Sequence, residues 1–295
     1  MSVTIALAGN PNCGKTTMFN ALTGANQYVG NWPGVTVEKK EGKLKNQKDV
    51  TVTDLPGIYS LSPYTLEEVV SRDYLLKEKP DVIIDLVDAT NIERNLYLAT
   101  QLLEIGIPVV IALNMVDLLK KNNIHINVKG LSSALGCPIV ETSALKGTGL
   151  KEVVDEAIKC ANQHRVPSKQ MEFPKAVEKA VNEIEGFVPA NIAEENKRWY
   201  AVKLLERDSK VKEGLNLPAS AQSRIEEIAS GLEKAEDDDT ESIVTDGRYQ
   251  YIQKIVSANV KRSGNKMTVS DKIDRIVTNR VLGLPIFILT MFIVY

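Results

Sequence analysis

The 295-residue sequence is poor in cysteine and has no excess of positive charge. Its three cysteines are scattered without a CxxC pair, which argues against a disulfide scaffold and a zinc site and indicates a reducing compartment. The formal net charge is −2, so nucleic acid is not an expected partner. His125 and His164 have no companion ligand nearby, and we expect them at the surface. The N-terminus lacks a charged segment followed by an apolar one, so no signal peptide is expected.

The last residues of the sequence have a different composition. Residues 281–295, VLGLPIFILTMFIVY, carry no charge but are shorter than the roughly 20 apolar residues that cross a bilayer. Arg275 and Arg280 precede them, as expected for the cytoplasmic flank of a membrane helix. We therefore expect a truncated first transmembrane segment at 281–295 after a linker at 263–280. A buried helix or strand of a soluble domain is the alternative.

Residues 9–17 form a phosphate-binding pattern between an apolar run and a predicted helix. A strand, a GxxxxGK[ST] loop and a helix together are typical of P-loop nucleotidases, because backbone N–H groups and the helix N-terminus face the phosphates. Lys15 is predicted to reach the β- and γ-phosphates, and the Thr16 hydroxyl to ligate Mg²⁺. A glycine-rich turn without a ligand is the alternative. The predicted nucleotide-binding residues of the loop are Gly9, Asn10, Pro11, Asn12, Cys13, Gly14, Lys15, Thr16 and Thr17.

Alternating apolar segments predict an α/β fold for the first part of the chain. Nearly continuous apolar runs are typical of buried parallel strands, and apolar residues at helical spacing lie between them. Such alternation predicts a doubly wound sheet, so we expect a P-loop domain over residues 1–165 with a mostly parallel six-stranded sheet. The predicted segments here are strands at 81–88, 108–114 and 138–142 and helices at 93–105 and 150–161.

Two other regions have a different pattern. Residues 27–40 contain two glycines, a proline and a tryptophan, which predicts a loop running into a strand. Residues 50–54 are predicted to form a second strand, antiparallel to that one. Residues 168–262 show helical spacing and no strand signal of similar strength, so we expect a separate all-helical regulatory domain.

Two further signals point to Mg²⁺ and the γ-phosphate. Asp54-Leu55-Pro56-Gly57 ends a predicted strand, where Asp54 would hold Mg²⁺ and the Gly57 N–H would contact the γ-phosphate. Thr36 lies in the loop before that strand, and it is expected to ligate Mg²⁺ and close over the γ-phosphate. Each signal is weak alone, but their order after a P-loop makes them strong together.

The remaining signals predict recognition of guanine. Asn114-Met115-Val116-Asp117 ends the strand at 108–114, and a carboxylate there can accept both the ring N–H and the exocyclic amine of guanine. Adenine lacks this pair of donors, so an ATP-driven pump is disfavoured. Ser143-Ala144-Leu145 follows the last predicted strand, and the Ala144 N–H is expected to support the base.

These motifs also carry a family resemblance. Residues 1 to about 165 resemble a Ras-like G domain of the TRAFAC class. The segments GNPNCGKTT, VGNWPGVTVE, DLPGIYSL, RDYLL, DATNIERNLYLATQLLE and ALNMVD resemble the cytoplasmic part of the bacterial ferrous iron transporter FeoB family. The resemblance implies GTP/GDP as ligand, Fe(II) as transported substrate, and the membrane domain of the same polypeptide and small accessory transport proteins as partners. It also implies the inner membrane, with this region on the cytoplasmic side.

One residue bears on the mechanism. Ile58 follows the DxxG motif where the Ras-like pattern has a glutamine, and an apolar side chain cannot orient a water molecule. The resemblance implies that K⁺ stabilises the transition state, with Asn12 as a ligand and backbone carbonyls of Gly30 and Trp32 as a cap. The alternative is that Asn12 only shapes the loop.

We therefore expect a Mg²⁺-dependent, K⁺-activated GTPase coupled to Fe(II) uptake. Lys15, Thr36, Gly57 and Asn12 are its expected catalytic groups. The alternative is a slow GTP-dependent switch that gates a membrane channel, which the apolar Ile58 favours.

Overall fold

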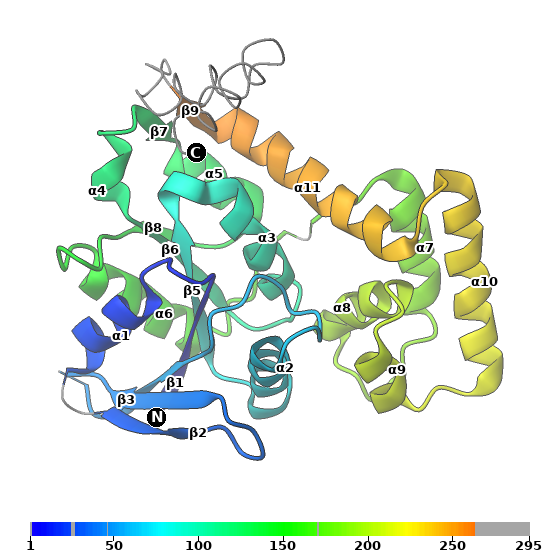
Figure 1. The fold of residues 1–295 in the computed structure, drawn as a ribbon, viewed down its shortest axis with the longest axis horizontal. Helices are drawn as coiled ribbons and strands as arrows, with labels where there is room; N and C mark the ends of the chain where they lie inside the picture. Colours follow the sequence, from blue (N-terminus) through cyan, green and yellow to red (C-terminus); the bar gives the residue numbers. More distant parts are fainter. Residues whose placement is uncertain (1, 25–26, 46, 170, 263–295) are drawn as a thin grey trace, which may run out of the picture.

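The computed structural model describes residues 2–24, 27–45, 47–169 and 171–262. An α/β unit is followed by a helical module at its side, and the long last helix returns to the α/β unit (Figure 1). The expected fold class is thereby confirmed. The seven-stranded sheet has the order β2-β3-β4-β1-β5-β6-β8, and its strands are β1 (Val3–Gly9), β2 (Gln27–Asn31), β3 (Glu38–Lys43), β4 (Val50–Asp54), β5 (Val82–Asp88), β6 (Val109–Asn114) and β8 (Ile139–Glu141).

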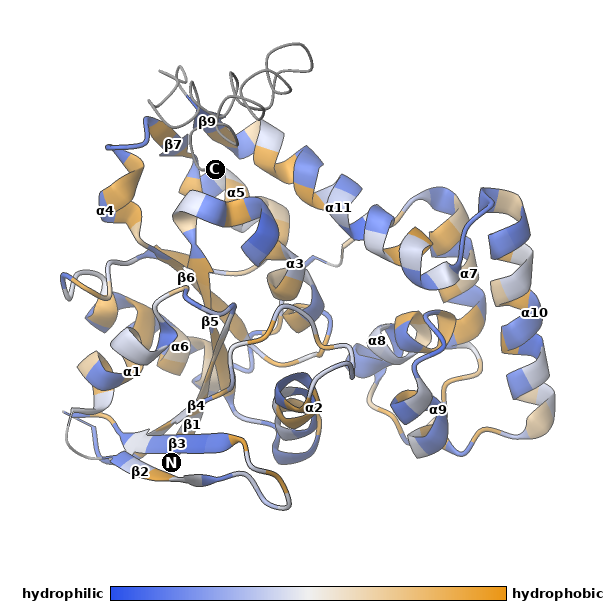
Figure 2. Cartoon of the chain, viewed as in Figure 1, coloured by the Kyte–Doolittle hydropathy of each residue, from blue (hydrophilic) through white to orange (hydrophobic). Residues whose placement is uncertain are grey.

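The middle of this sheet is parallel and buried. Strand β1 pairs in parallel with β4 and β5, and β6 pairs in parallel with β5 and β8. All residues of β5 and β6 are buried, and Figure 2 shows these strands mostly in the orange of hydrophobic residues. Helices cover both faces, so nearly continuous apolar runs are required in these strands. Because the strands are parallel, the residues that follow β1, β4 and β6 come out at one edge of the sheet.

Each face of the sheet packs against its own helices. One face carries Ile5, Leu7 and Ile84, which share a core with α1 and α6. The other face carries Ile83 and Ile111, which share a core with α3, α5 and the helical module. The helices and turns of the α/β unit are α1 (Lys15–Thr23), α2 (Leu66–Asp73), η1 (Tyr74–Glu78), η2 (Ala89–Asn91), α3 (Ile92–Leu102), α4 (Val116–Leu119), α5 (Val128–Leu135) and α6 (Leu150–Asn162).

The predicted number of strands was wrong by one. Gln27–Asn31, expected as a loop, forms β2 and pairs antiparallel with β3, which is itself antiparallel to β4 as predicted. Strand β3 is EKKEGK, and its charges pair with one another at a spacing of two residues, with 3.1 Å between Lys39 Nζ and Glu41 Oε2. A hydrophilic strand such as β3 has no alternating apolar pattern by which the sequence could predict it. Its outer edge nevertheless offers the backbone hydrogen bonds that order β2.

The helical module contains five helices and is tied to the α/β unit by buried ion pairs. Arg248 of α11 contacts Glu104 with 2.6 Å between Nη2 and Oε2, and Arg72 of α2 contacts Asp208 at 2.6 Å. A short strand at 260–262, which the sequence did not predict, pairs antiparallel with a strand after α4. These elements are α7 (Lys175–Glu185), α8 (Glu194–Leu205), α9 (Ser209–Leu215), α10 (Ala219–Glu236), α11 (Thr240–Asn259), β7 (Ile124–Ile126) and β9 (Val260–Arg262).

The predicted linker at 263–280 and the predicted membrane segment at 281–295 lie outside the described residues. Within residues 2–262, apart from the four undescribed positions, the structure has no helix with the length and apolarity that a membrane crossing requires. His125 and His164 are exposed, as expected.

A buried carboxyl in the central sheet makes stability depend on pH. Asp85 of β5 is 1% exposed, and its Oδ2 atom has no hydrogen-bond partner among the described residues. Burial raises the pKa of the Asp85 carboxyl to about 7, whereas in an unfolded chain an aspartate has a pKa of about 4. Between these values the native protein binds a proton that the unfolded chain has lost. The contribution of Asp85 to the free energy of unfolding should therefore fall as pH rises from about 4 to about 7.

The Asp85→Asn variant should lose this part of the pH dependence, because its side chain does not titrate. Urea unfolding at several pH values between about 5 and about 8 measures the difference. Asp246→Asn, at an exposed position of α11, should retain the slope of the unmodified protein. If the free energy of unfolding changes with pH at the same slope in Asp85→Asn and in the unmodified protein, the raised pKa assigned to Asp85 is contradicted.

Candidate functional site

The loop between β1 and α1 has the backbone shape that the sequence predicts. Gly9, Asn12 and Gly14 have φ values of 149°, 65° and 95°. A Cβ atom at Gly9 would lie 2.8 Å from the Leu86 carbonyl oxygen, and one at Gly14 would lie 2.5 Å from Asn114 Nδ2. Both glycines are therefore required for conformation and for space. The loop curls around the start of α1, where unpaired N–H groups and the helix dipole favour an anion.

Lys15 and Asp54 meet beside this loop. Lys15 Nζ lies 2.6 Å from Asp54 Oδ1, and both side chains are nine-tenths buried or more. Burial raises the pKa of the Asp54 carboxyl above its usual range, and the Lys15 ammonium opposes that effect. The adjacent Cys13 thiol is buried, and its pKa is raised to about 12, so it stays protonated and fills space.

Asn114 joins the phosphate loop to the loop after β8. Its Nδ2 donates to the Cys13 carbonyl at 2.8 Å, and its Oδ1 accepts from the Ala144 N–H at 2.9 Å. The Thr142 hydroxyl also donates to Oδ1, at 3.3 Å. One buried amide therefore fixes the distance between the two loops. The sequence indicated Asn114 and Ala144 as site residues but not this contact between them.

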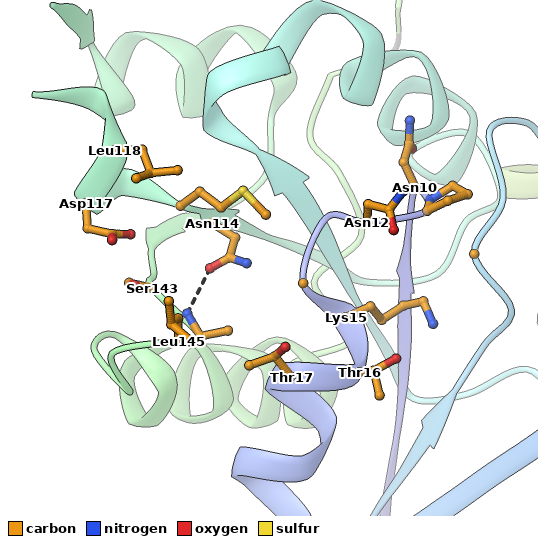
Figure 3. A pocket seen from close by; sticks show the side chains of 15 residues that line it. Asn10, Asn12, Lys15, Thr16, Thr17, Asn114, Asp117, Leu118, Ser143 and Leu145 are labelled. Carbon is orange, nitrogen blue, oxygen red and sulfur yellow. Dashed lines mark hydrogen bonds between the residues drawn. The ribbon is translucent and has the colours of Figure 1, made fainter. Parts of the chain in front are cut away.

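These loops enclose a cleft of about 670 Å³ at the edge of the sheet. Figure 3 shows the phosphate loop on one side, and Asp117, Ser143 and Leu145 on the other. The dimensions suit a ligand of nucleotide size. The lining residues are Asn10, Pro11, Asn12, Gly14, Lys15, Thr16, Thr17, Gly57, Asn114, Met115, Asp117, Leu118, Ser143, Ala144 and Leu145.

Asp117 is held as a carboxylate at the end of the cleft opposite the phosphate loop. The Ser143 hydroxyl and the Lys146 ammonium hold the pKa of the Asp117 carboxyl below its usual range. Lys146 Nζ lies 3.3 Å from Asp117 Oδ2. An ionised aspartate accepts hydrogen bonds and cannot donate them, so this end of the cleft suits a base edge with two donors. Sequence reasoning missed Lys146, although it directly follows the Ser143–Leu145 motif.

The predicted residues of the segment before β3 do not reach the cleft. Thr36 is exposed, and neither Thr36, Gly30 nor Trp32 lines the cleft. Gly30 pairs with Lys39 in the β2–β3 ladder, and Trp32 is buried against Tyr74 of η1. The structure therefore brings together the phosphate loop, Gly57 and the base-side motifs, but not these three residues.

The chain after β4 is fixed from two sides. The Ile58 N–H donates to the Gly9 carbonyl at 3.3 Å, and the Ile58 side chain is buried. Gln101 of α3 accepts from the Leu61 N–H at 2.6 Å. The buried ammonium of Lys203 in α8 reaches the Ser62 hydroxyl at 3.4 Å, which links this segment to the helical module. Sequence reasoning missed Lys203, because a lysine at helical spacing is usually exposed.

Known proteins share the sequence and the fold of this chain. Residues 3–157 match the family model of ferrous iron transport protein B, and residues 173–261 match the model of the FeoB cytosolic helical domain. The Fe(2+) transporter FeoB of Shigella flexneri is 40% identical over 99% of this chain, which spans only 38% of that relative's length.

Similar chains have solved structures whose descriptions name bound ligands. A GDP-bound variant of the S. thermophilus FeoB G-domain superposes with a TM-score of 0.85 at 47% identity, and covers 88% of this chain and 100% of its own. NFeoB from S. thermophilus bound to GDP·AlF4⁻ and K⁺ has a TM-score of 0.79 at 48% identity, and covers 86% of this chain and 99% of its own. With two family models that together match most of its length, the chain belongs to the ferrous iron transport protein B (FeoB) family.

Proposed function

We propose that this chain binds GTP and hydrolyses it to GDP and phosphate. The observation that carries the proposal is that one cleft holds a phosphate loop at one end and an ionised aspartate at the other, at a spacing fixed by Asn114. GDP in the structures of similar chains supports the same ligand class.

Guanine is the base that fits Asp117. Its carboxylate accepts two hydrogen bonds, and guanine presents two adjacent donors while adenine presents none in that arrangement. Ala144 lies beside the same end of the cleft, but its N–H already donates to Asn114 Oδ1 and would have to share or exchange that bond to contact the base. A base that leaves the Asp117 carboxylate without donors loses charge-assisted hydrogen bonds, which are the stronger ones.

The phosphate end of the cleft provides positive charge and hydrogen-bond donors. The Lys15 ammonium would exchange its contact with Asp54 for the β- and γ-phosphates, and the Gly57 N–H would donate to the γ-phosphate. Two side chains could provide oxygen ligands for Mg²⁺. Thr16 is exposed at the start of α1, and the Asp54 carboxylate lies beside Lys15. Bound Mg²⁺ would neutralise charge on the phosphates.

Asn12 is the residue proposed to act through K⁺. It lines the cleft with an exposed amide, so its carbonyl oxygen is available to a monovalent cation beside the phosphates. The K⁺ in the structure of a similar chain supports this assignment. Thr36, Gly30 and Trp32 would complete the site only after the segment before β3 changes its position. The buried Ile58 has no polar side-chain atom to orient the attacking water, so another group would have to position it, while charge neutralisation would stabilise the transition state.

We further propose that the chain is the cytoplasmic part of a ferrous iron transporter in the inner membrane. Support comes from the relatives, which are named as Fe(2+) transporters. The chain spans 38% of the length of the relative from Shigella flexneri. The described residues contain no cluster of three or more histidine, cysteine and carboxylate side chains that could hold a metal ion. Any Fe(II) pathway is therefore assigned to the membrane domain, and small accessory proteins stay a prediction. The proposed domains are 1–165 for GTP hydrolysis and 168–262 for regulation.

A slow GTP-dependent switch is the second candidate. The buried Ile58 favours it, as does the direct contact of the following segment with Lys203 of the helical module. Single-turnover hydrolysis measured against the rate of GDP release distinguishes the two candidates. Release much faster than hydrolysis supports the switch.

The Asp117→Asn variant should change the base preference. It should bind GDP about a hundredfold more weakly, or worse, because two hydrogen bonds to a charged group are lost. It should gain affinity for xanthosine diphosphate, since an amide can donate to the additional oxygen of that base. Calorimetry with both nucleotides measures this, and Asp155→Asn, exposed on α6, is the matched control. An unchanged preference in Asp117→Asn would refute guanine recognition at this site.

Asn12→Ala should remove the dependence of GTP turnover on K⁺. We expect the unmodified protein to hydrolyse GTP faster in K⁺ than in Na⁺, and the variant to show equal, slow rates in both salts. GDP affinity should change little, because the phosphate loop donates through its backbone. Asn182→Ala, exposed on α7, should retain the difference between salts. Equal rates in the two salts for the unmodified protein would exclude the K⁺ mechanism.

A further inference from the structure

The segment 27–38 is attached to the α/β unit through Trp32. The Trp32 side chain is 7% exposed, whereas Tyr28 in the same segment is 70% exposed. Its ring centroid lies 5.3 Å from that of Tyr74 in an edge-to-face arrangement of 71°. Its Nε1 donates to the Glu38 carbonyl at 3.1 Å. The indole therefore combines apolar burial, an aromatic contact and a hydrogen bond in one place.

The backbone of Trp32 closes the turn that carries Thr36. The Trp32 N–H donates to the Val37 carbonyl at 2.9 Å, and the Trp32 carbonyl accepts from the Val35 N–H at 3.3 Å. Thr36 lies within this turn and is exposed. The turn, and with it the outward position of Thr36, is thus set by the residue whose indole is buried.

Tyr74 belongs to the fixed part of the unit. It is 8% exposed, and its hydroxyl donates to Thr53 Oγ1 at 3.1 Å. Thr53 directly precedes Asp54 on β4. The connection from β2 to β3 lies below α2, the helix that leads into Tyr74, in the view of Figure 1. Tyr74 does not line the cleft. A change of Tyr74 therefore acts on the nucleotide site only through its neighbours.

We propose that Trp32 and Tyr74 are a positioning pair for GTP hydrolysis. Their contact stabilises the arrangement in which Thr36 lies outside the cleft, and moving Thr36 onto a γ-phosphate breaks it. A nucleoside diphosphate binds without disturbing the pair, and a triphosphate binds at the cost of separating it. The pair thereby sets the preference between the two nucleotides. This inference rests on the proposed function, because it assigns Thr36 to the γ-phosphate.

Trp32 fluorescence tests the inference directly. The sequence has two tryptophans, so Trp199→Phe leaves Trp32 as the only one. A non-hydrolysable GTP analogue with Mg²⁺ and K⁺ should shift its emission to longer wavelength and increase quenching by acrylamide, and GDP should do neither. Calorimetry on the same samples measures binding. An emission that stays the same with the analogue bound overturns the inference alone. Failure of both nucleotides to bind overturns the proposed function as well.

Tyr74→Leu provides a functional readout. Losing the aromatic contact should favour the triphosphate analogue over GDP by about three- to tenfold in the ratio of dissociation constants. Tyr200→Leu is the matched control, because Tyr200 forms an edge-to-face pair with Trp199 in the helical module, with ring centroids 5.0 Å apart. It should leave the ratio unchanged. The ratio compares two ligands on the same folded molecules, so a loss of stability alone does not move it. An unchanged ratio in Tyr74→Leu overturns the inference.

Discussion

The geometry of the cleft depends on one buried amide. Asn114 donates to the carbonyl of Cys13 and accepts from the N–H of Ala144, so it holds the phosphate loop and the base loop at one separation. A buried donor or acceptor left without a partner costs about 1–3 kcal/mol, which makes both contacts strongly preferred. The parallel sheet brings these loops to the same edge, and Asn114 at the end of β6 fixes them there.

The flanking segments differ in how they are held. The segment after β4 contacts both Gln101 of α3 and Lys203 of the helical module, so it is attached to both units. The segment before β3 is held by a hydrophilic strand pair and by Trp32. In the function proposed here, 27–38 would be the adjustable element, and the segment after Gly57 would connect the site to the helical module.

The sequence predicted the parts of the fold that have strong local patterns. Strands β5 and β6 are nearly continuous apolar runs, and the phosphate loop is specified by its glycines, so all three were predictable. Strand β2 was not predictable, because QYVGN leaves its two apolar side chains exposed and its partner is charged. The burial of Trp32 and Lys203 was not predictable either. Trp32 packs on Tyr74, which is distant in sequence, and the Lys203 ammonium is buried with Glu206 Oε2 at 2.6 Å and the distant Ser62 hydroxyl at 3.4 Å.

The central claim is that one cleft binds a guanine nucleotide and is completed by the movement of segment 27–38. A structure of this chain with GDP, aluminium fluoride, Mg²⁺ and K⁺ tests it most directly. The account predicts Thr36 within the cleft, the indole of Trp32 separated from Tyr74, and a cation between Asn12 and the carbonyls of Gly30 and Trp32. A bound nucleotide with Thr36 still outside the cleft and Trp32 still packed on Tyr74 would contradict it.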